Sequence, residues 1–119
     1  MSDSYSQGKT TVSPDVLITI ARLSALSVSG VSRMAQVPGG VNRLFKRGAH
    51  EGVRIQVEDN TVFASLYLIL KKDVNIREVS RNVQHQVARA LHEMVSMDIG
   101  GIEIQIEDID YEETEAAPA

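Results

Sequence analysis

The sequence predicts an α+β domain with a small mixed β-sheet of four to five strands and two helices packed on one face. Two apolar patterns predict it. Apolar residues that alternate with polar ones indicate strands with one buried face, and apolar residues that recur every three or four positions indicate helices. In chain order these segments run strand, helix, strand, strand, strand, helix, strand. Strands grouped in this way around two helices are typical of the α+β class.

The first part of the chain carries the signals of a short strand, a helix and a second strand. We expect the first strand over residues 9–12. A helix should then begin at Pro14, because Ser13 stands at the N-cap position and proline is favoured at the first helical position. Further apolar residues follow at helical spacing, namely Val16, Leu17, Ile20, Leu23 and Leu26. Gly30 is well placed to end this segment in a left-handed conformation, and residues 31–34 are expected to form the next strand.

Two further strands are expected after a glycine-rich loop at 37–52. In residues 53–58, valine and isoleucine alternate with polar residues, as in a strand with one buried face. A turn at 58–61 leads into residues 62–71, which are apolar on both faces. The second of these apolar faces consists of Phe63, Tyr67 and Ile69. We therefore expect a central strand whose second face is available for cover by another subunit.

The strongest local signal introduces a long second helix. Asn75 can cap this helix and Glu78 can complete a capping box, with valines at the two positions of a hydrophobic staple. The helix is expected to run to about residue 97. Its apolar stripe comprises Ile76, Val79, Val83, Val87, Leu91, Met94 and Val95. Residues 102–107 then alternate isoleucine with polar residues, which predicts a last strand.

Length and composition fit one compact domain. The chain has 119 residues, a formal net charge of −4 and no cysteine. We interpret residues 1–8 as a disordered lead, 9–109 as a single domain and 110–119 as a disordered acidic tail, because the two ends lack apolar periodicity. The absence of cysteine excludes disulfides and thiolate metal sites. No apolar run approaches the roughly 18 residues of a membrane span, so direct membrane insertion is not expected.

The loop region 37–54 is the most basic part of the chain and raises the question of a phosphate site. Its basic residues include Arg43, Lys46, Arg47 and Arg54. The region contains adjacent glycines but lacks the Gly-Lys-Ser/Thr ending of a P-loop, and its flanks are strand-like. A surface loop with solvated charges is the simpler interpretation, and an anionic partner such as a protein, a lipid head group or RNA is the alternative. The net negative charge of the chain argues against broad nucleic-acid binding.

Neither a metal site nor a catalytic site emerges from the sequence. His85 and His92 are separated by about 10.5 Å along the axis of the predicted helix, so one ion cannot bridge them. The serines near the end of the first helix do not lie in a strained elbow pattern, and their spacing identifies no His or Asp partners. We therefore expect no metal, no cofactor and no enzymatic activity.

A row of basic residues runs along the second helix in steps of four positions. The row comprises Arg77, Arg81, His85 and Arg89. Its simpler interpretation is a solvated face with local pairs, such as Arg89 with Glu93. The alternative is a docking face for an acidic segment, for which the acidic tail of another copy is a candidate.

Several short segments, taken in their order and spacing, resemble a known family. They are Gly8-Lys9 followed by Ser13-Pro14-Asp15-Val16, Gly30-Val31, and Leu66-Tyr67-Leu68-Ile69 leading to Val74-Asn75-Ile76 and Glu78-Val79. This arrangement, over roughly residues 8–109, is similar to the alkaline shock protein family of bacterial general-stress and cell-envelope proteins. The resemblance implies a small cytoplasmic protein without catalytic activity or cofactor. It also implies self-association, and contact with the membrane through a small membrane-anchored partner. It assigns no site residues.

Three functional hypotheses follow. The first is a stress-related scaffold or adaptor in cell-envelope homeostasis, with contacts through the strand at 62–70 and the basic helix face. The second is an RNA-binding module that uses the basic residues of the region 37–54. The third is a regulator of a lipid-metabolism enzyme. RNA titrations at two salt concentrations distinguish the first two, because contacts to phosphates weaken steeply with salt.

Overall fold

The computed structural model describes residues 11–36 and 49–111 of the chain. Its elements are α1 (Pro14–Leu26), β1 (Val31–Met34), β2 (Ala49–His50), β3 (Val53–Glu58), β4 (Thr61–Lys71), α2 (Ile76–Val95) and β5 (Asp98–Asp110). The α+β class is confirmed. Of the first strand expected over 9–12, the two described residues, Thr11 and Val12, are not in a strand, and the other two lie outside the described residues.

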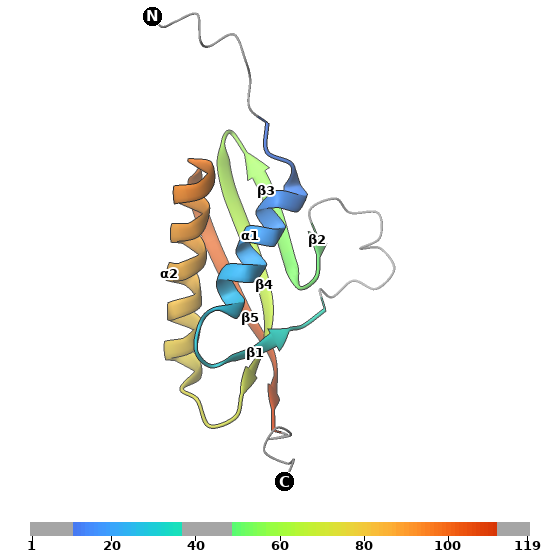
Figure 1. Ribbon diagram of the computed structural model, residues 1–119, viewed down its shortest axis with the longest axis vertical. Coiled ribbons are helices and arrows are strands. Elements are labelled where there is room, and N and C mark those ends of the chain that lie inside the picture. Colours follow the sequence, from blue (N-terminus) through green and yellow to red (C-terminus); the bar gives the residue numbers. More distant parts are fainter. Residues whose placement is uncertain (1–10, 37–48, 112–119) are drawn as a thin grey trace, which may run out of the picture.

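Strand β4 is the centre of a mixed five-stranded sheet (Figure 1). Along one edge it pairs in parallel with β5 over its whole length, from Thr61 to Lys71. Along the other edge it pairs antiparallel first with β3 and then with β1, and the short β2 extends β3 outward. The change of partner occurs at Tyr67, whose N–H donates to Gly52 O and whose carbonyl accepts from Ala35 N, both at 2.8 Å. The doubly apolar sequence of β4 suits this central position.

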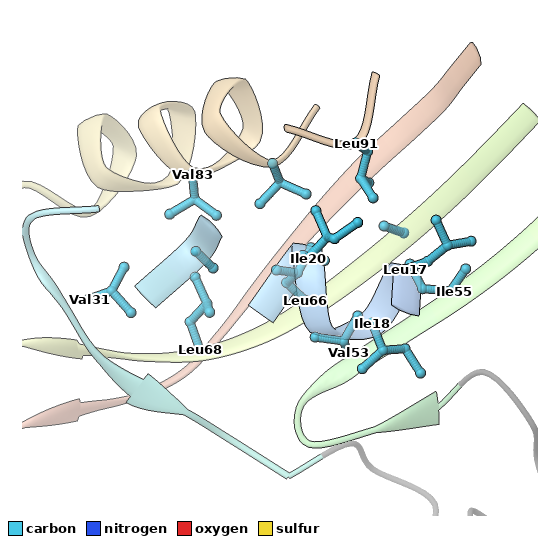
Figure 2. Packing of buried hydrophobic residues seen from close by; sticks show 14 of the residues in the cluster. Leu17, Ile18, Ile20, Val31, Val53, Ile55, Leu66, Leu68, Val83 and Leu91 are labelled. Atoms are coloured by element: carbon cyan, nitrogen blue, oxygen red, sulfur yellow. The ribbon is translucent and has the colours of Figure 1, made fainter. Parts of the chain in front are cut away.

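Both helices pack on the same face of the sheet, where they enclose an aliphatic core (Figure 2). Alternate residues of β4 point into this core and are almost completely buried, namely Val62, Ala64, Leu66, Leu68 and Leu70. The isoleucines of β5 stand beside them, as in the register pairs Leu66 with Ile104 and Leu68 with Ile106. The opposite face of β4 is therefore directed away from the helices.

Helix α2 begins at the predicted N-cap and ends at Val95, two residues before the expected end. The Asn75 side chain accepts a hydrogen bond from Glu78 N at 2.9 Å, which satisfies one free donor of the first turn. Ser96 ends the helix in the left-handed conformation and donates its N–H to His92 O at 2.9 Å. Four residues spaced by four, Val79, Val83, Val87 and Leu91, form the buried side. Two residues of the predicted apolar stripe, Ile76 and Met94, lie at the helix ends and are exposed.

Helix α1 is rotated relative to its apolar periodicity. Its buried residues are Leu17, Ile18, Ile20, Ala21 and Ala25. Of the apolar residues that recur at helical spacing, Val16, Leu23 and Leu26 are 45%, 54% and 37% exposed. The two alanines explain the difference, because their small side chains allow the helix backbone to approach its neighbours closely. The helix ends at Leu26, and Gly30, at a φ of 102°, forms the turn into β1 rather than the helix end.

Candidate interaction surface

The face of the sheet opposite the helices, called here the open face, carries the second apolar side of β4. No helix covers this face in the part of the chain that the structure describes. Tyr67 and Ile69 are each 8% exposed, whereas Phe63 is 40% exposed. The apolar row that the sequence predicts is therefore present, and its Phe63 end is the accessible one.

Cationic side chains lie over the other part of the open face. The guanidinium carbon of Arg54, on β3, is 5.8 Å from the centroid of the Tyr67 ring, which is within the range of a cation–π contact. The Arg54 Nε atom is buried and has no hydrogen-bond partner among the described residues. Further along, Arg33 Nε lies 3.9 Å from Asp110 Oδ2, and Ser32 Oγ donates to the same oxygen at 2.8 Å.

A shallow hollow lies at the Phe63 end of the open face, where the register places Gly101 of β5 beside Phe63 of β4. A Cβ atom added at Gly101 would meet no atom within 4 Å. The missing side chain therefore leaves open space next to an exposed aromatic ring. The polar residues that line the hollow are Gln56, Glu58, Ser65 and Glu103 of the sheet and Gln84 of α2, which reaches the edge of β5. We call this feature the Phe63 hollow.

The Phe63 hollow is acidic. Glu58 and Glu103 are exposed, and within the described ranges no basic side chain pairs with either. Glu103 is held by neutral groups, because Ser65 Oγ donates to it at 3.3 Å and Gln105 Nε2 at 3.5 Å. Two carboxylates beside an aromatic ring suit a side chain that has an apolar stem and a cationic end.

The predicted basic row of α2 lies on the other side of the molecule. Its members Arg77, Arg81, His85 and Arg89 are all exposed. Each member stands two positions before a residue of the buried side of α2, which corresponds to about 200° around the helix. The basic row therefore points away from the sheet. Arg89 pairs with Glu93 at 3.3 Å. Arg77 and Arg81 have no ion pair with any residue that the structure describes.

The structure does not bring the predicted basic residues together. Arg43, Lys46 and Arg47 lie outside the described residues. Arg54 lies on the open face, on the far side of the sheet from the basic row of α2. The Phe63 hollow was not predicted, since it depends on the parallel register of β4 with β5. The adjacent glycines 100 and 101 at the start of a strand are the one sequence signal that could have indicated it.

Two further observations concern other classes of function. Within residues 11–36 and 49–111, no group of three or more His, Asp or Glu side chains is arranged to hold a metal ion. Among the helices of those residues, none combines the length and the apolar character needed to cross a membrane.

Solved structures with a similar fold include domains called MamM CTD. The zinc form of one variant covers 84% of this chain and 90% of its own, with a TM-score of 0.52 and 11% sequence identity. The match to the nickel form of another variant covers 81% of this chain and 99% of that domain, with a TM-score of 0.52 and 9% sequence identity. At this identity the likeness concerns the fold alone.

Comparison with protein families and curated proteins gives a direct relationship. The uncharacterized protein YqhY of Bacillus subtilis (strain 168) is 30% identical over 107 residues, which cover 88% of this chain and 79% of that protein. The uncharacterized protein Spy1535 of Streptococcus pyogenes serotype M6 is 31% identical over 110 residues, which cover 90% of this chain and 83% of that protein. Residues 2–111 match the model of the alkaline shock protein 23 family, whose description is a cell envelope-related function. The chain therefore belongs to the alkaline shock protein 23 family.

Proposed function

We propose that this protein is a non-catalytic, self-associating scaffold or adaptor in cell-envelope homeostasis, and that it reaches the membrane through a partner. Membership of a family with a cell envelope-related function supports the general role. The open face of the sheet supports self-association. A two-layer α+β domain leaves one sheet face uncovered, and here that face carries Phe63 at 40% exposure in the same row of β4 as the buried Tyr67 and Ile69.

The exposed ring of Phe63 is the observation that carries the proposal. An aromatic side chain on a flat sheet face offers a large apolar area at little conformational cost, and such residues dominate the energetics of protein interfaces. Its neighbour on β3 is the polar Gln56 and its neighbour on β5 is Gly101, so no large apolar side chain flanks the ring across the strands. Cover by a second protein surface would remove this ring from water.

Sedimentation velocity of the purified protein tests self-association. Wild-type protein is expected to show oligomers that increase with concentration, and Phe63→Ser is expected to shift the distribution to monomer. Met94→Ser is the matched control, because Met94 is 67% exposed but lies at the end of α2. A wild-type protein that stays monomeric at every concentration contradicts the proposal, and so does unchanged assembly of Phe63→Ser.

Membrane contact through a partner has its own test. Purified protein is expected to remain unbound in flotation with vesicles of bacterial lipids. In lysates of the native cells, the same protein is expected to sediment in part with membranes and to be released by mild detergent together with a membrane protein. Flotation of the purified protein with vesicles would indicate direct binding instead, and complete absence from native membranes would contradict a membrane role.

A further inference from the structure

We propose that the basic row of α2 in one copy docks onto the Phe63 hollow of a second copy. This inference rests on the proposed self-association and specifies both contacting surfaces and their arrangement. The first argument is charge complementarity within one chain. Arg77 and Arg81 are exposed without an ion pair on one side of the described structure, and Glu58 and Glu103 are exposed without one on the other.

The chemistry of the Phe63 hollow suits an arginine side chain. The hollow combines open space above Gly101, an exposed aromatic ring and two carboxylates. An arginine can lay its aliphatic stem and the flat side of its guanidinium on an aromatic ring while its N–H groups donate to carboxylates. Such charge-assisted hydrogen bonds are stronger than those between neutral groups.

The dimensions of the two surfaces also agree. From Arg77 to Arg89 the basic row is about 18 Å long, at 1.5 Å per residue. From Phe63 to Ile69 the open face of β4 is about 20 Å long, at 3.3 Å per residue. One helix can therefore lie along the strand and span the apolar row of the open face.

The charges favour one direction of the helix on the strand. The N-terminal half of the basic row carries the unpaired Arg77 and Arg81, which match the acidic Phe63 hollow. The C-terminal half carries Glu93 beside Arg89. A helix placed with this half toward Arg54 brings a carboxylate near the guanidinium of Arg54, which has no ion pair with any residue that the structure describes. The reverse direction would place arginines next to Arg54.

The arrangement determines the kind of assembly. The basic row and the Phe63 hollow lie on opposite sides of the two-layer domain, so a two-fold dimer cannot engage both surfaces of both copies. Each copy instead offers its row to one neighbour and its hollow to another. Such a heterologous contact produces an open chain or a ring of copies, not a closed dimer.

A mixing experiment tests this arrangement. The row variant carries Arg77→Gln and Arg81→Gln, and the hollow variant carries Glu58→Lys and Glu103→Lys. Each variant alone is expected to assemble at least about tenfold more weakly than wild type in sedimentation velocity. An equimolar mixture is expected to form dimers and nothing larger, because only the hollow of the row variant and the row of the hollow variant remain complementary.

Controls separate this inference from its alternatives. Arg77→Lys with Arg81→Lys keeps the charge but loses the flat guanidinium, so its assembly is expected to lie between those of the row variant and wild type. Raising salt from about 0.05 M to about 0.5 M is expected to weaken the assembly of wild type. Circular dichroism of every variant checks the fold.

Different outcomes contradict different statements. Wild-type assembly that is unchanged in both variants overturns this inference but leaves self-association intact, whereas a monomeric wild type overturns both. A mixture that stays monomeric, or that forms large oligomers, also contradicts it. Assembly that is lost on substituting the three glutamates 112, 113 and 115 by glutamine, but not in the hollow variant, would show that the basic row receives the acidic tail instead.

Discussion

The ring of Phe63 lies over Gly100, so that a Cβ atom added to this glycine would be 2.4 Å from Cε2 of the ring. The next residue, Gly101, has open space instead. Two adjacent glycines thus serve different purposes in one strand. The first lets the ring lie close to the β5 backbone, and the second leaves the Phe63 hollow beside it.

Gly100→Ala is expected to displace the Phe63 ring without unfolding the domain. The ring is at the end of a side chain that is 40% exposed, so it can rotate away from the new methyl group. The free energy of unfolding should fall by about 1 kcal/mol or less. The free energy of self-association, measured by sedimentation velocity, should change more than the free energy of unfolding, measured by urea denaturation. Equal assembly of Gly100→Ala and wild type would contradict the role given to the ring position.

Gly52→Ala is expected to be strongly destabilising. Gly52 has a φ of 82°, and an added Cβ would lie 2.5 Å from the backbone oxygen of Ala35. The left-handed conformation alone costs about 1–3 kcal/mol for a residue other than glycine, and the backbone clash adds to it. Gly101→Ala is the control, expected within about 0.5 kcal/mol of wild type in chemical denaturation. A small effect of Gly52→Ala would show that β1 and β3 can separate at this point.

Asn75→Ala is expected to destabilise the domain by about 1 kcal/mol, because the substitution removes the hydrogen bond from Glu78 N at the start of α2. Ser13→Ala is the matched control at the start of α1. Ser13 occupies the N-cap position but makes no side-chain cap hydrogen bond, so its substitution should have a smaller effect. Thermal and urea denaturation of both variants measure the difference. Equal losses would argue that Ser13 caps α1 in solution.

Leu66→Ala is expected to lower the free energy of unfolding by about 2–5 kcal/mol. Leu66 belongs to the central strand β4 and is completely buried in the core under the two helices. Leu23→Ala is the control of the same chemical change on α1, where the side chain is 54% exposed. It should stay within about 0.5 kcal/mol of wild type. A large effect of Leu23→Ala would contradict the rotation of α1 described above.

Sequence patterns are reliable here where the signal is local. Asn75 caps α2 as expected, and the buried side of the helix is the four-residue repeat of Val79, Val83, Val87 and Leu91. The helix ends at Val95, two residues before the expected end at 97. For α1 the same kind of pattern is misleading, because it predicts that Leu23 faces the core whereas this side chain is exposed. The burial of α1 depends on how closely Ala21 and Ala25 pack against neighbouring elements, which a helical repeat of large apolar residues does not encode.

Patterns in the sequence were enough to predict the α+β class, the central doubly apolar strand and the basic row of α2. These features depend on side-chain periodicity and on capping residues within one segment. The structure was needed to show that Phe63 is the accessible end of the second face of β4, and that Glu58, Phe63, Gly101 and Glu103 line one hollow. These residues come from three strands, and the pairing that unites them is set by long-range packing and not by local preference.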